Sequence, residues 1–401
     1  MLVLEGVRIL ELVHMPPGEL CTMMLGDFGA DVIKVEPLLP MGEGQEAYDA
    51  EAMKALQAFN ALNRNKKSIR LNLKSDRGKQ VFYKLAVDAD VIVEGFRPGV
   101  VKRMGVDYKA VSKINPRIIY CSLSGYGQDG PYSQHPGHDI NYISIAGALN
   151  LIGWPGQQPA IPLNLLGDFA GASLHGIVGI LAALFAREKT GKGQFVDISY
   201  TDSVITLLTF FLQQHFSAGY SFPRGQWALS GGYPYYKTYQ AADGKLISLG
   251  CIEPWFWDNL CRAIGRDDLK EFHFDLDHLG HGPDGPQWDK VEQELKKIFL
   301  TRPRDEWFDF LIKHDVPVGK VYSLQEVFTD PQLLHRQMLL EFDHPRLGKV
   351  RQPGIAIKLS ETPGKVRSLA PYSGEHTVDV LLSLGYSKAD IESLRKANAI
   401  G

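Results

Sequence analysis

The stretch DVIVEGF, residues 90–96, is a short apolar run that ends in a glutamate, a glycine and a phenylalanine. It follows the helix-like segment DRGKQVFYKLAVDA (76–89) and precedes a second apolar run, RIIYCSLSG (117–125). Strands that alternate with helical segments of about 10–15 residues are typical of βαβ units in a parallel sheet. This part of the chain therefore predicts an α/β fold.

The same alternation extends in both directions. Toward the N-terminus, VRILEL (7–12), ADVIKVE (30–36) and SIRLNL (68–73) are apolar runs, with the helix-like GELCTMMLGDFG after the first. Toward the C-terminus, FAGASLHGIVGILAALFAR (169–187) predicts a tightly packed buried helix, and TGKGQFVDISY (190–200) predicts a turn and a strand. The parallel sheet thus extends to about residue 200.

A nicotinamide-binding Rossmann domain is disfavoured. Its fingerprint places Gly-x-Gly-x-x-Gly between the first strand and its helix, where this chain has VHMPPGEL (13–20). Gly26 and Gly29 lie at the far end of that helix, where glycine commonly serves as a C-terminal cap.

After residue 225 the alternation of strands and helices is replaced by another pattern. GGYPYYKTYQAADGKLISLGC (231–251) predicts an antiparallel hairpin that turns at AADG, and helical segments follow at 254–264, 287–314 and 374–396. We expect a small α+β domain at 226–325, after the α/β region.

The composition is that of an ordinary globular protein, with 44% hydrophobic and 22% charged residues among 401. The net charge of −3 provides no drive toward nucleic acid or an anionic membrane. No stretch approaches the roughly 20 apolar residues of a membrane span, and the N-terminus lacks a signal-peptide pattern. The four cysteines lack metal-ligand spacing and fit reduced thiols, so we expect a cytoplasmic protein without a metal.

Two residues that directly follow a glycine, a histidine and an aspartate, are candidates for proton transfer. His138 in GHDINY (137–142) and Asp168 in LLGDFAGAS (165–173) each follow a glycine, Gly137 or Gly167, that would let a ligand approach closely. An imidazole titrates near neutral pH, and a carboxyl of raised pKa suits the complementary role. Backbone N–H groups after Asp168 could hold an enolate oxygen.

Structural roles compete with these interpretations. Asp139 and Asp168 could be helix N-caps, and His138 a hydrogen-bonded structural histidine. Glu253 in CIEPWF precedes Pro254, a residue favoured at the first helical position. It could support a catalytic imidazolium, or simply benefit from a helix dipole.

Positive charge gathers in NRNKKSIRLNLK (63–74), which contains Arg64, Lys67 and Arg70, and Arg97 follows a strand in EGFRPG. Ligands of α/β sheets bind near strand ends, so these residues could contact a phosphorylated small molecule. A solvated basic face is the alternative.

The chain resembles the class III CoA-transferase superfamily, of the formyl-CoA transferase type, and within it is most similar to the α-methylacyl-CoA racemases. The resemblance runs from GDFGADVIKVEP through EGFRPGV, SGYGQDGPY and TGKGQFVDIS to DVPVGKVYSL and GEHT. Three motifs carry the similarity to racemases: Gly-His-Asp-Ile-Asn, Gly-Asp-Phe and Ile-Glu-Pro.

The resemblance implies that His138 and Asp168 are the two bases and that Glu253 supports the histidine. Transferases of the superfamily instead use an aspartate as nucleophile, and Asp139 stands at that place. The resemblance also implies a large Rossmann-like domain, which we place at 1–200 and 335–401, joined to the small domain by linkers at 201–225 and 326–334. It further implies an interlocked homodimer, in which Glu253 would reach the partner subunit's His138. Pro37 replaces an arginine that some racemases carry after KVE, which leaves the CoA phosphate contacts open.

We therefore expect an acyl-CoA racemase that inverts the carbon next to the thioester of a 2-methyl-branched or 2-aryl acyl-CoA. The transfer would run through an enolate, and CoA would be part of the substrate rather than a cofactor. A CoA-transferase that uses Asp139, or a non-catalytic CoA-binding protein, are the alternatives.

Overall fold

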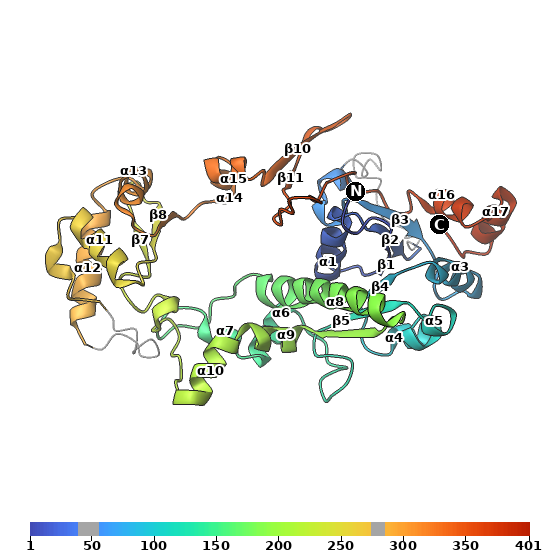
Figure 1. Cartoon of the computed structure of the whole chain (residues 1–401), viewed down its shortest axis with the longest axis horizontal. Coiled ribbons are helices and arrows are strands. Elements are labelled where there is room, and N and C mark those ends of the chain that lie inside the picture. Colours follow the sequence, from blue (N-terminus) through green and yellow to red (C-terminus); the bar gives the residue numbers. More distant parts are fainter. Residues whose placement is uncertain (39–55, 274–284) are drawn as a thin grey trace, which may run out of the picture. The chain divides into compact units, whose positions relative to one another are not determined.

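The structure is a computed structural model, and it describes residues 1–38, 56–273 and 285–401 (Figure 1). These residues form two compact units. Unit 1 contains residues 1–143, 164–204 and 331–401, and unit 2 contains residues 144–163 and 205–330. Residues 144–163, which we expected in the large domain, thus cluster with unit 2.

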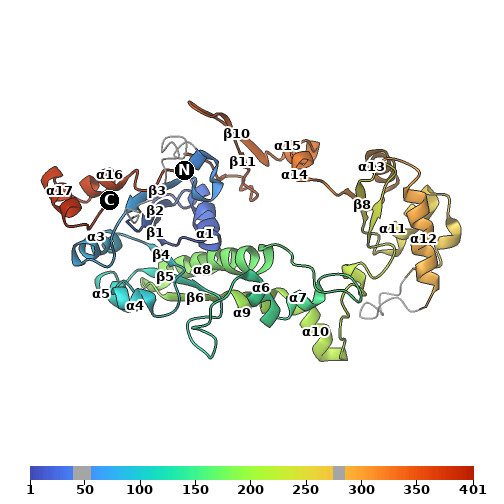
Figure 2. The same ribbon diagram turned by 180° about the vertical axis from the view of Figure 1, so that it is seen from behind.

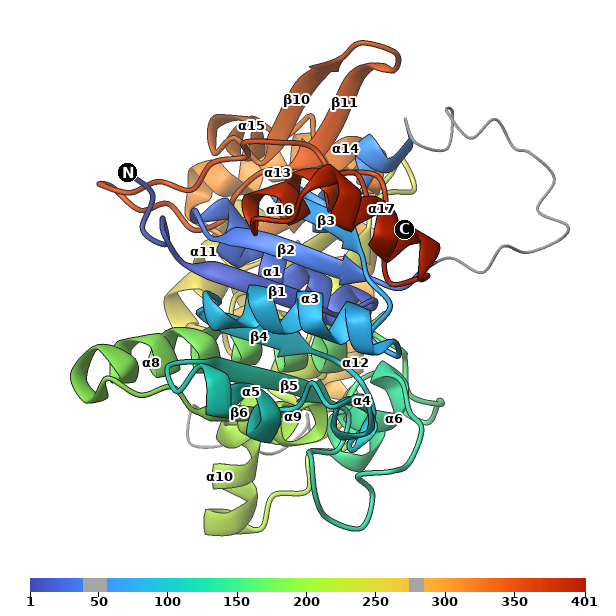
Figure 3. The same ribbon diagram turned by 90° about the vertical axis from the view of Figure 1, so that its right-hand side faces the viewer.

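Unit 1 is built on a six-stranded parallel sheet in the order β3-β2-β1-β4-β5-β6, seen face-on in Figure 3. This is the doubly wound order, and it changes direction between β1 and β4, where such sheets bind ligands. The α/β prediction is confirmed. The strands are β1 (Arg8–Leu12), β2 (Asp31–Glu36), β3 (Lys66–Arg70), β4 (Val91–Glu94), β5 (Ile119–Ser124) and β6 (Phe195–Ser199).

Helices cover both faces of this sheet because its strands alternate two sets of buried apolar side chains. Leu10 and Ile92 belong to the core under α3, α5, α16 and α17. Their neighbours Ile9 and Val91 belong to the core under α1 and α8. The helices of unit 1 are α1 (Pro16–Asp27), η1 (Gln57–Phe59), η2 (Ala61–Asn63), α3 (Asp76–Val87), α4 (Val100–Met104), α5 (Tyr108–Ile114), α6 (Asp139–Ile145), η3 (Leu165–Leu174), α8 (His175–Thr190), α9 (Tyr200–Leu207), α15 (Pro331–His335), α16 (Thr377–Ser383) and α17 (Lys388–Lys396). An antiparallel pair, β10 (Leu339–His344) and β11 (Gly348–Pro353), completes the unit.

The helix predicted at 169–187 begins earlier and extends further than expected. It starts as the π-helix η3 at Leu165 and continues through α8 to Thr190. By length and composition alone this helix could cross a membrane, which corrects our expectation that no segment approaches that limit. Ile180 and Ala183 pack into the core against the sheet, as in the central helix of a globular domain.

Unit 2 is an α+β unit around a three-stranded antiparallel sheet, β7-β8-β9 (Figure 2). The predicted hairpin is confirmed, with β7 and β8 joined at the AADG turn. Trp257 of α11, Leu295 of α12 and Leu311 of α13 fill the core. Its elements are α7 (Ala148–Leu151), α10 (Thr209–Ala218), η4 (Ala228–Ser230), β7 (Thr238–Gln240), β8 (Leu246–Leu249), α11 (Pro254–Ala263), η5 (Asp267–Leu269), α12 (Gln287–Phe299), α13 (Arg304–Leu311), η7 (Ile312–His314), β9 (Val318–Lys320) and α14 (Leu324–Val327).

Candidate functional site

His138 immediately precedes α6, in the loop that follows the carboxyl end of β5. Its side chain is exposed, and its backbone is held by the start of the helix. The His138 N–H donates to Oδ1 of Asn141 at 3.0 Å, and the His138 carbonyl accepts from the N–H of Asn141 at 2.8 Å. The backbone under the imidazole is therefore fixed while the ring faces solvent.

Gly137 lies against two tyrosines that leave no room for a side chain. A Cβ at this position would lie 2.7 Å from Cε1 of Tyr142 and 3.0 Å from the hydroxyl oxygen of Tyr126. The Tyr142 hydroxyl also donates to the Gly137 carbonyl. Protein rings thus occupy the space that a side chain would need, and a ligand contact by Gly137 stays a prediction.

Asp168 is the fourth residue of the π-helix η3 and not its cap, since the cap position is Asn164. The carboxylate of Asp168 is half-buried and accepts a hydrogen bond from Nδ2 of Asn164 at 3.2 Å. The structural alternative that Asp168 caps this helix is thus wrong. π-Helical turns are rare in proteins, and those that occur often lie at functional sites. This π-helix carries the predicted acid, Asp168.

Asp139 joins the starts of the two helices. Its Oδ2 accepts a hydrogen bond from the Asp168 N–H at 2.8 Å, and its side chain is 5% exposed. Gly167 lies against it, since a Cβ there would be 3.0 Å from the same oxygen. The other oxygen, Oδ1, is buried without a hydrogen-bond partner in the structure. The Asp168 N–H is consequently unavailable to an enolate, and the N–H groups that follow it lie inside the π-helix and donate along it. The expectation that these N–H groups hold an enolate oxygen is therefore corrected.

The electrostatic environment makes Asp168 a weaker acid than usual. Burial raises its pKa above the ordinary value of 3.8, and the neighbouring carboxylate of Asp139 raises it further. The hydrogen bond from Asn164 and the nearby imidazole of His138 act in the opposite direction. His138 and Asp168 are therefore close enough to interact, and the net effect of these surroundings is a raised pKa of Asp168.

Two tyrosines and Arg97 surround the same carboxylates. The rings of Tyr142 and Tyr200 meet edge to face with centroids 5.2 Å apart. Burial raises the pKa of Tyr142 to about 12, where Asp168 and Asp139 add to the shift and Arg97 opposes it. Asp168 also contributes to the raised pKa of Tyr200. The structure thus brings His138, Asp139, Asp168 and Arg97 together in unit 1.

The remaining basic residues do not converge on one point. Arg64 is 1% exposed and binds Asp27 through two hydrogen bonds of 3.0 and 2.6 Å. Lys67 pairs with Asp31 at 2.7 Å, and Arg70 donates to Oγ of Ser373 at 3.1 Å. The Arg64 guanidinium is occupied inside the protein, so a nucleotide contact by Arg64 would require breaking a buried ion pair. We correct that assignment, while Lys67 and Arg70 remain predicted contacts.

Glu253 lies in unit 2, directly before α11. Pro254 occupies the first helical position as predicted, and the Glu253 side chain makes no capping hydrogen bond. Support of a catalytic imidazole by Glu253 stays a prediction.

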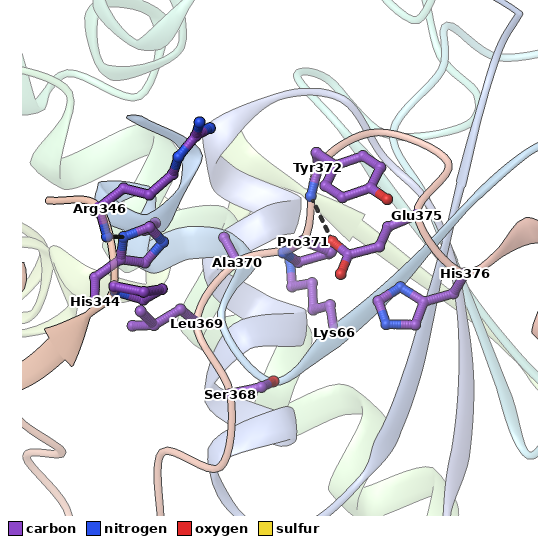
Figure 4. Close-up of a pocket in the computed structure, with 12 residues that line it drawn as sticks. Lys66, His344, Arg346, Ser368, Leu369, Ala370, Pro371, Tyr372, Glu375 and His376 are labelled. Carbon is purple, nitrogen blue, oxygen red and sulfur yellow. Dashed lines mark hydrogen bonds between the residues drawn. The ribbon is translucent and has the colours of Figure 1, made fainter. Parts of the chain in front are cut away.

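A pocket of about 430 Å³ lies in unit 1, apart from these residues (Figure 4). It is lined by the C-terminal segment at 368–376, by His344 and Arg346, and by Lys66. In the GEHT motif, Glu375 accepts the Tyr372 N–H at 3.0 Å and Nδ1 of His376 accepts the Ser68 N–H at 3.3 Å. This motif attaches the C-terminal segment to β3.

The sequence interpretation missed two side-chain amides that hydrogen-bond the candidate residues, those of Asn141 and Asn164. Asn141 stands three residues after His138, and Asn164 stands four residues before Asp168, so helical spacing was the available signal. In the part of the chain that the structure describes, no group of three or more histidine, cysteine or acidic side chains is arranged to hold a metal. The four cysteines are free and buried.

The profile of CoA-transferase family III matches residues 4–377. An alpha-methylacyl-CoA racemase of Mus musculus is 34% identical over 393 residues, which cover 98% of this chain and 96% of that protein. A formyl-CoA:oxalate CoA-transferase of Streptomyces coelicolor is 32% identical, with 99% of both chains covered. A CaiB/BaiF family protein from Brucella suis shares the fold, with a TM-score of 0.78 and 28% identity over 96% of this chain and 99% of that one.

Proposed function

Because the chain belongs to CoA-transferase family III, we propose that it is an acyl-CoA racemase acting on 2-methyl-branched or 2-aryl thioesters. The observation that carries the proposal is the proximity of His138 to Asp168, a carboxyl whose pKa is raised by burial. Racemisation needs one group that accepts a proton and one that already holds a proton. The similarity to the mouse racemase supports the same choice.

In the proposed reaction, one of the two side chains removes the proton from the carbon next to the thioester. The electron pair of that C–H bond moves into the enolate. The other side chain then donates its proton to the opposite face of the carbon. The two groups have exchanged protonation states, so the pair is ready for the reverse reaction.

The reaction is redox-neutral and moves only protons. CoA enters as part of the substrate, and the proposal requires neither a redox cofactor nor a metal. Glu253 is proposed to support His138 across a homodimer, and the cytoplasm is the proposed compartment.

The experiment is solvent-deuterium incorporation. A (2R)-2-methylacyl-CoA is incubated with the protein in deuterated water, and both the deuterium at the α-carbon and the ratio of epimers are measured. We expect deuterium uptake with inversion, and a loss of ~100-fold or more for His138→Ala and for Asp168→Ala. Transfer of CoA to an added free carboxylic acid, without α-deuteration, would overturn the proposal.

A CoA-transferase is the second candidate, because a formyl-CoA:oxalate CoA-transferase is nearly as similar to the chain as the racemases. That reaction would need a carboxylate nucleophile to attack the thioester. The carboxylate of Asp139 is buried and holds the Asp168 N–H, which favours a supporting role over attack.

A further inference from the structure

Glu94 is a buried carboxyl that the proposed proton transfer does not use. It is the last residue of β4, next to β1 where the strand order changes direction, and it is 1% exposed. Burial raises its pKa to about 7, and Asp197 on β6 contributes to the shift. Burying a carboxyl is costly unless hydrogen bonds compensate it, so its contacts indicate what it does.

The Glu94 side chain connects two strands to the turn that follows β4. Its Oε2 accepts the Phe96 N–H at 2.8 Å. A second hydrogen bond joins it to Ser122 on β5, which is also 1% exposed. The carboxyl therefore fixes the first residues of the Gly95–Gly99 turn against the interior of the sheet.

The other end of the Gly95–Gly99 turn is held independently. The Pro98 carbonyl accepts a hydrogen bond from Nε2 of Gln134 at 3.2 Å, in the loop that leads to His138. Gly99 has a φ of +87°, and the following helix α4 begins with Val100, whose N–H donates to the Arg97 carbonyl. Arg97 is thus an exposed side chain between two anchors.

Arg97 acts on the same tyrosine as the two aspartates of the site. Its positive charge opposes the effect of Asp168 and Asp139 on the pKa of Tyr142. Movement of the Gly95–Gly99 turn would therefore move a cation relative to the carboxylates of the site.

We propose that Glu94 is a positioning residue for substrate binding, whose side chain holds the Gly95–Gly99 turn so that Arg97 contacts an anionic group of CoA. The identity of the ligand rests on the proposed function. In this role Glu94 does not touch the substrate, and its effect on binding passes through Arg97.

A double-mutant cycle on CoA binding tests this dependence. Free CoA is titrated by calorimetry into wild type, Glu94→Ala, Arg97→Ala and the double variant. We expect Arg97→Ala to weaken binding ~10-fold or more and Glu94→Ala to weaken it several-fold. In the Arg97→Ala background the Glu94 substitution should have no further effect. Additive losses, or no loss in Glu94→Ala, would overturn the proposal.

Three further variants distinguish a specific loss of affinity from a folding defect. Glu94→Gln keeps an oxygen that can accept the Phe96 N–H, so it should restore most of the affinity that Glu94→Ala loses. Gln134→Ala releases the other anchor of the turn and leaves the buried carboxyl intact, so it should weaken binding only when Arg97 is present. Arg117→Ala removes an arginine at the amino end of β5 and serves as the control that binds CoA like wild type.

The measurement is separate from the test of the proposed reaction, because free CoA binds without chemistry. A protein that binds CoA but exchanges no α-proton would refute the racemase proposal and leave the cycle interpretable. An α-exchanging protein whose cycle is additive would refute only the role of Glu94.

Discussion

The carboxylate of Asp139 separates the two candidate reactions. Alanine at this position would remove the acceptor of the Asp168 N–H, so an alanine variant would lose activity under either reaction. Asparagine keeps an acceptor oxygen but cannot form the acyl anhydride of a transferase. A racemase should therefore tolerate Asp139→Asn far better than Asp139→Ala.

We expect Asp139→Asn to retain α-deuterium exchange within ~10-fold of wild type and Asp139→Ala to lose ~100-fold, the order expected when a catalytic group is displaced. Rates are measured at several pH values, since removing the negative charge should lower the pKa of Asp168 and move the acid limb to lower pH. Asp107→Asn, an aspartate before α5 without a capping bond, is the control. An inactive Asp139→Asn that is folded would favour transfer.

The raised pKa of Glu94 predicts that the free energy of unfolding depends on pH. Its pKa is raised from 4.5 to about 7 by folding. A carboxyl with a raised folded pKa contributes stability below its unfolded pKa, and this contribution is lost as pH rises through the folded value. Relative to wild type, Glu94→Gln should therefore gain about 3 kcal/mol between pH 4 and pH 8. Urea unfolding at the two pH values measures the difference, and a constant difference would contradict the buried, largely neutral carboxyl.

At the scale of elements, η3 and α8 show how one helix serves both chemistry and packing. The π-helical part positions Asp168, and the α-helical part lies closely on the sheet. A Cβ at Gly179 would lie 2.9 Å from Cγ1 of Val196 on β6 and 3.3 Å from Cδ1 of Ile198. The glycine therefore sets the distance between α8 and β6.

Gly179→Ala tests this packing against helix propensity. Alanine is favoured over glycine by about 1 kcal/mol inside a helix, yet the close contact with Val196 should reverse the sign. We expect destabilisation by about 1–3 kcal/mol in thermal or urea unfolding. Gly26→Ala in α1 is the matched control, because the nearest atom to its Cβ would be 3.4 Å away. Equal effects of the two substitutions would contradict close packing at α8.

At the scale of the whole molecule, the outer side of the continuous helix η3–α8 carries an apolar stripe. Leu174, Val178, Leu181 and Phe185 are 40–65% exposed, although they belong to a helix whose other side is core. Their spacing of three and four residues places them on one side of the helix. Exposed apolar patches of this kind mark interaction surfaces, and the homodimer implied by the family resemblance would cover one.

The homodimer is therefore a testable proposal. We expect wild type to have the mass of two chains by light scattering at micromolar concentration, and Val178→Glu with Phe185→Glu to shift it toward one chain. Lys113→Glu, a charge change at an exposed position of α5, should leave the mass unchanged. A monomeric wild type would exclude this assembly.

Most of the fold was predictable because its signals are local. DVIVEGF and its neighbouring apolar runs became parallel strands, and the AADG hairpin formed as expected. The start of η3 was misplaced by several residues, since nothing in the residue types of NLLGDF indicates a π-helix. The assignment of Arg64 was wrong as well, because the acid that neutralises Arg64 lies 37 residues away at Asp27.

The sequence alone determined the α/β class, the strands and the family, since each depends on neighbouring residues or on motifs of fixed spacing. Only the tertiary structure decided that Asp139 holds the Asp168 N–H, that Glu94 is bound to the turn before Arg97, and that Arg64 is internal. The first and the last of these relations join residues about 30 or more positions apart, and the second depends on the burial of Glu94 within the sheet. Burial and charge at such contacts set the pKa of each acid, and neither quantity exists until the chain has folded.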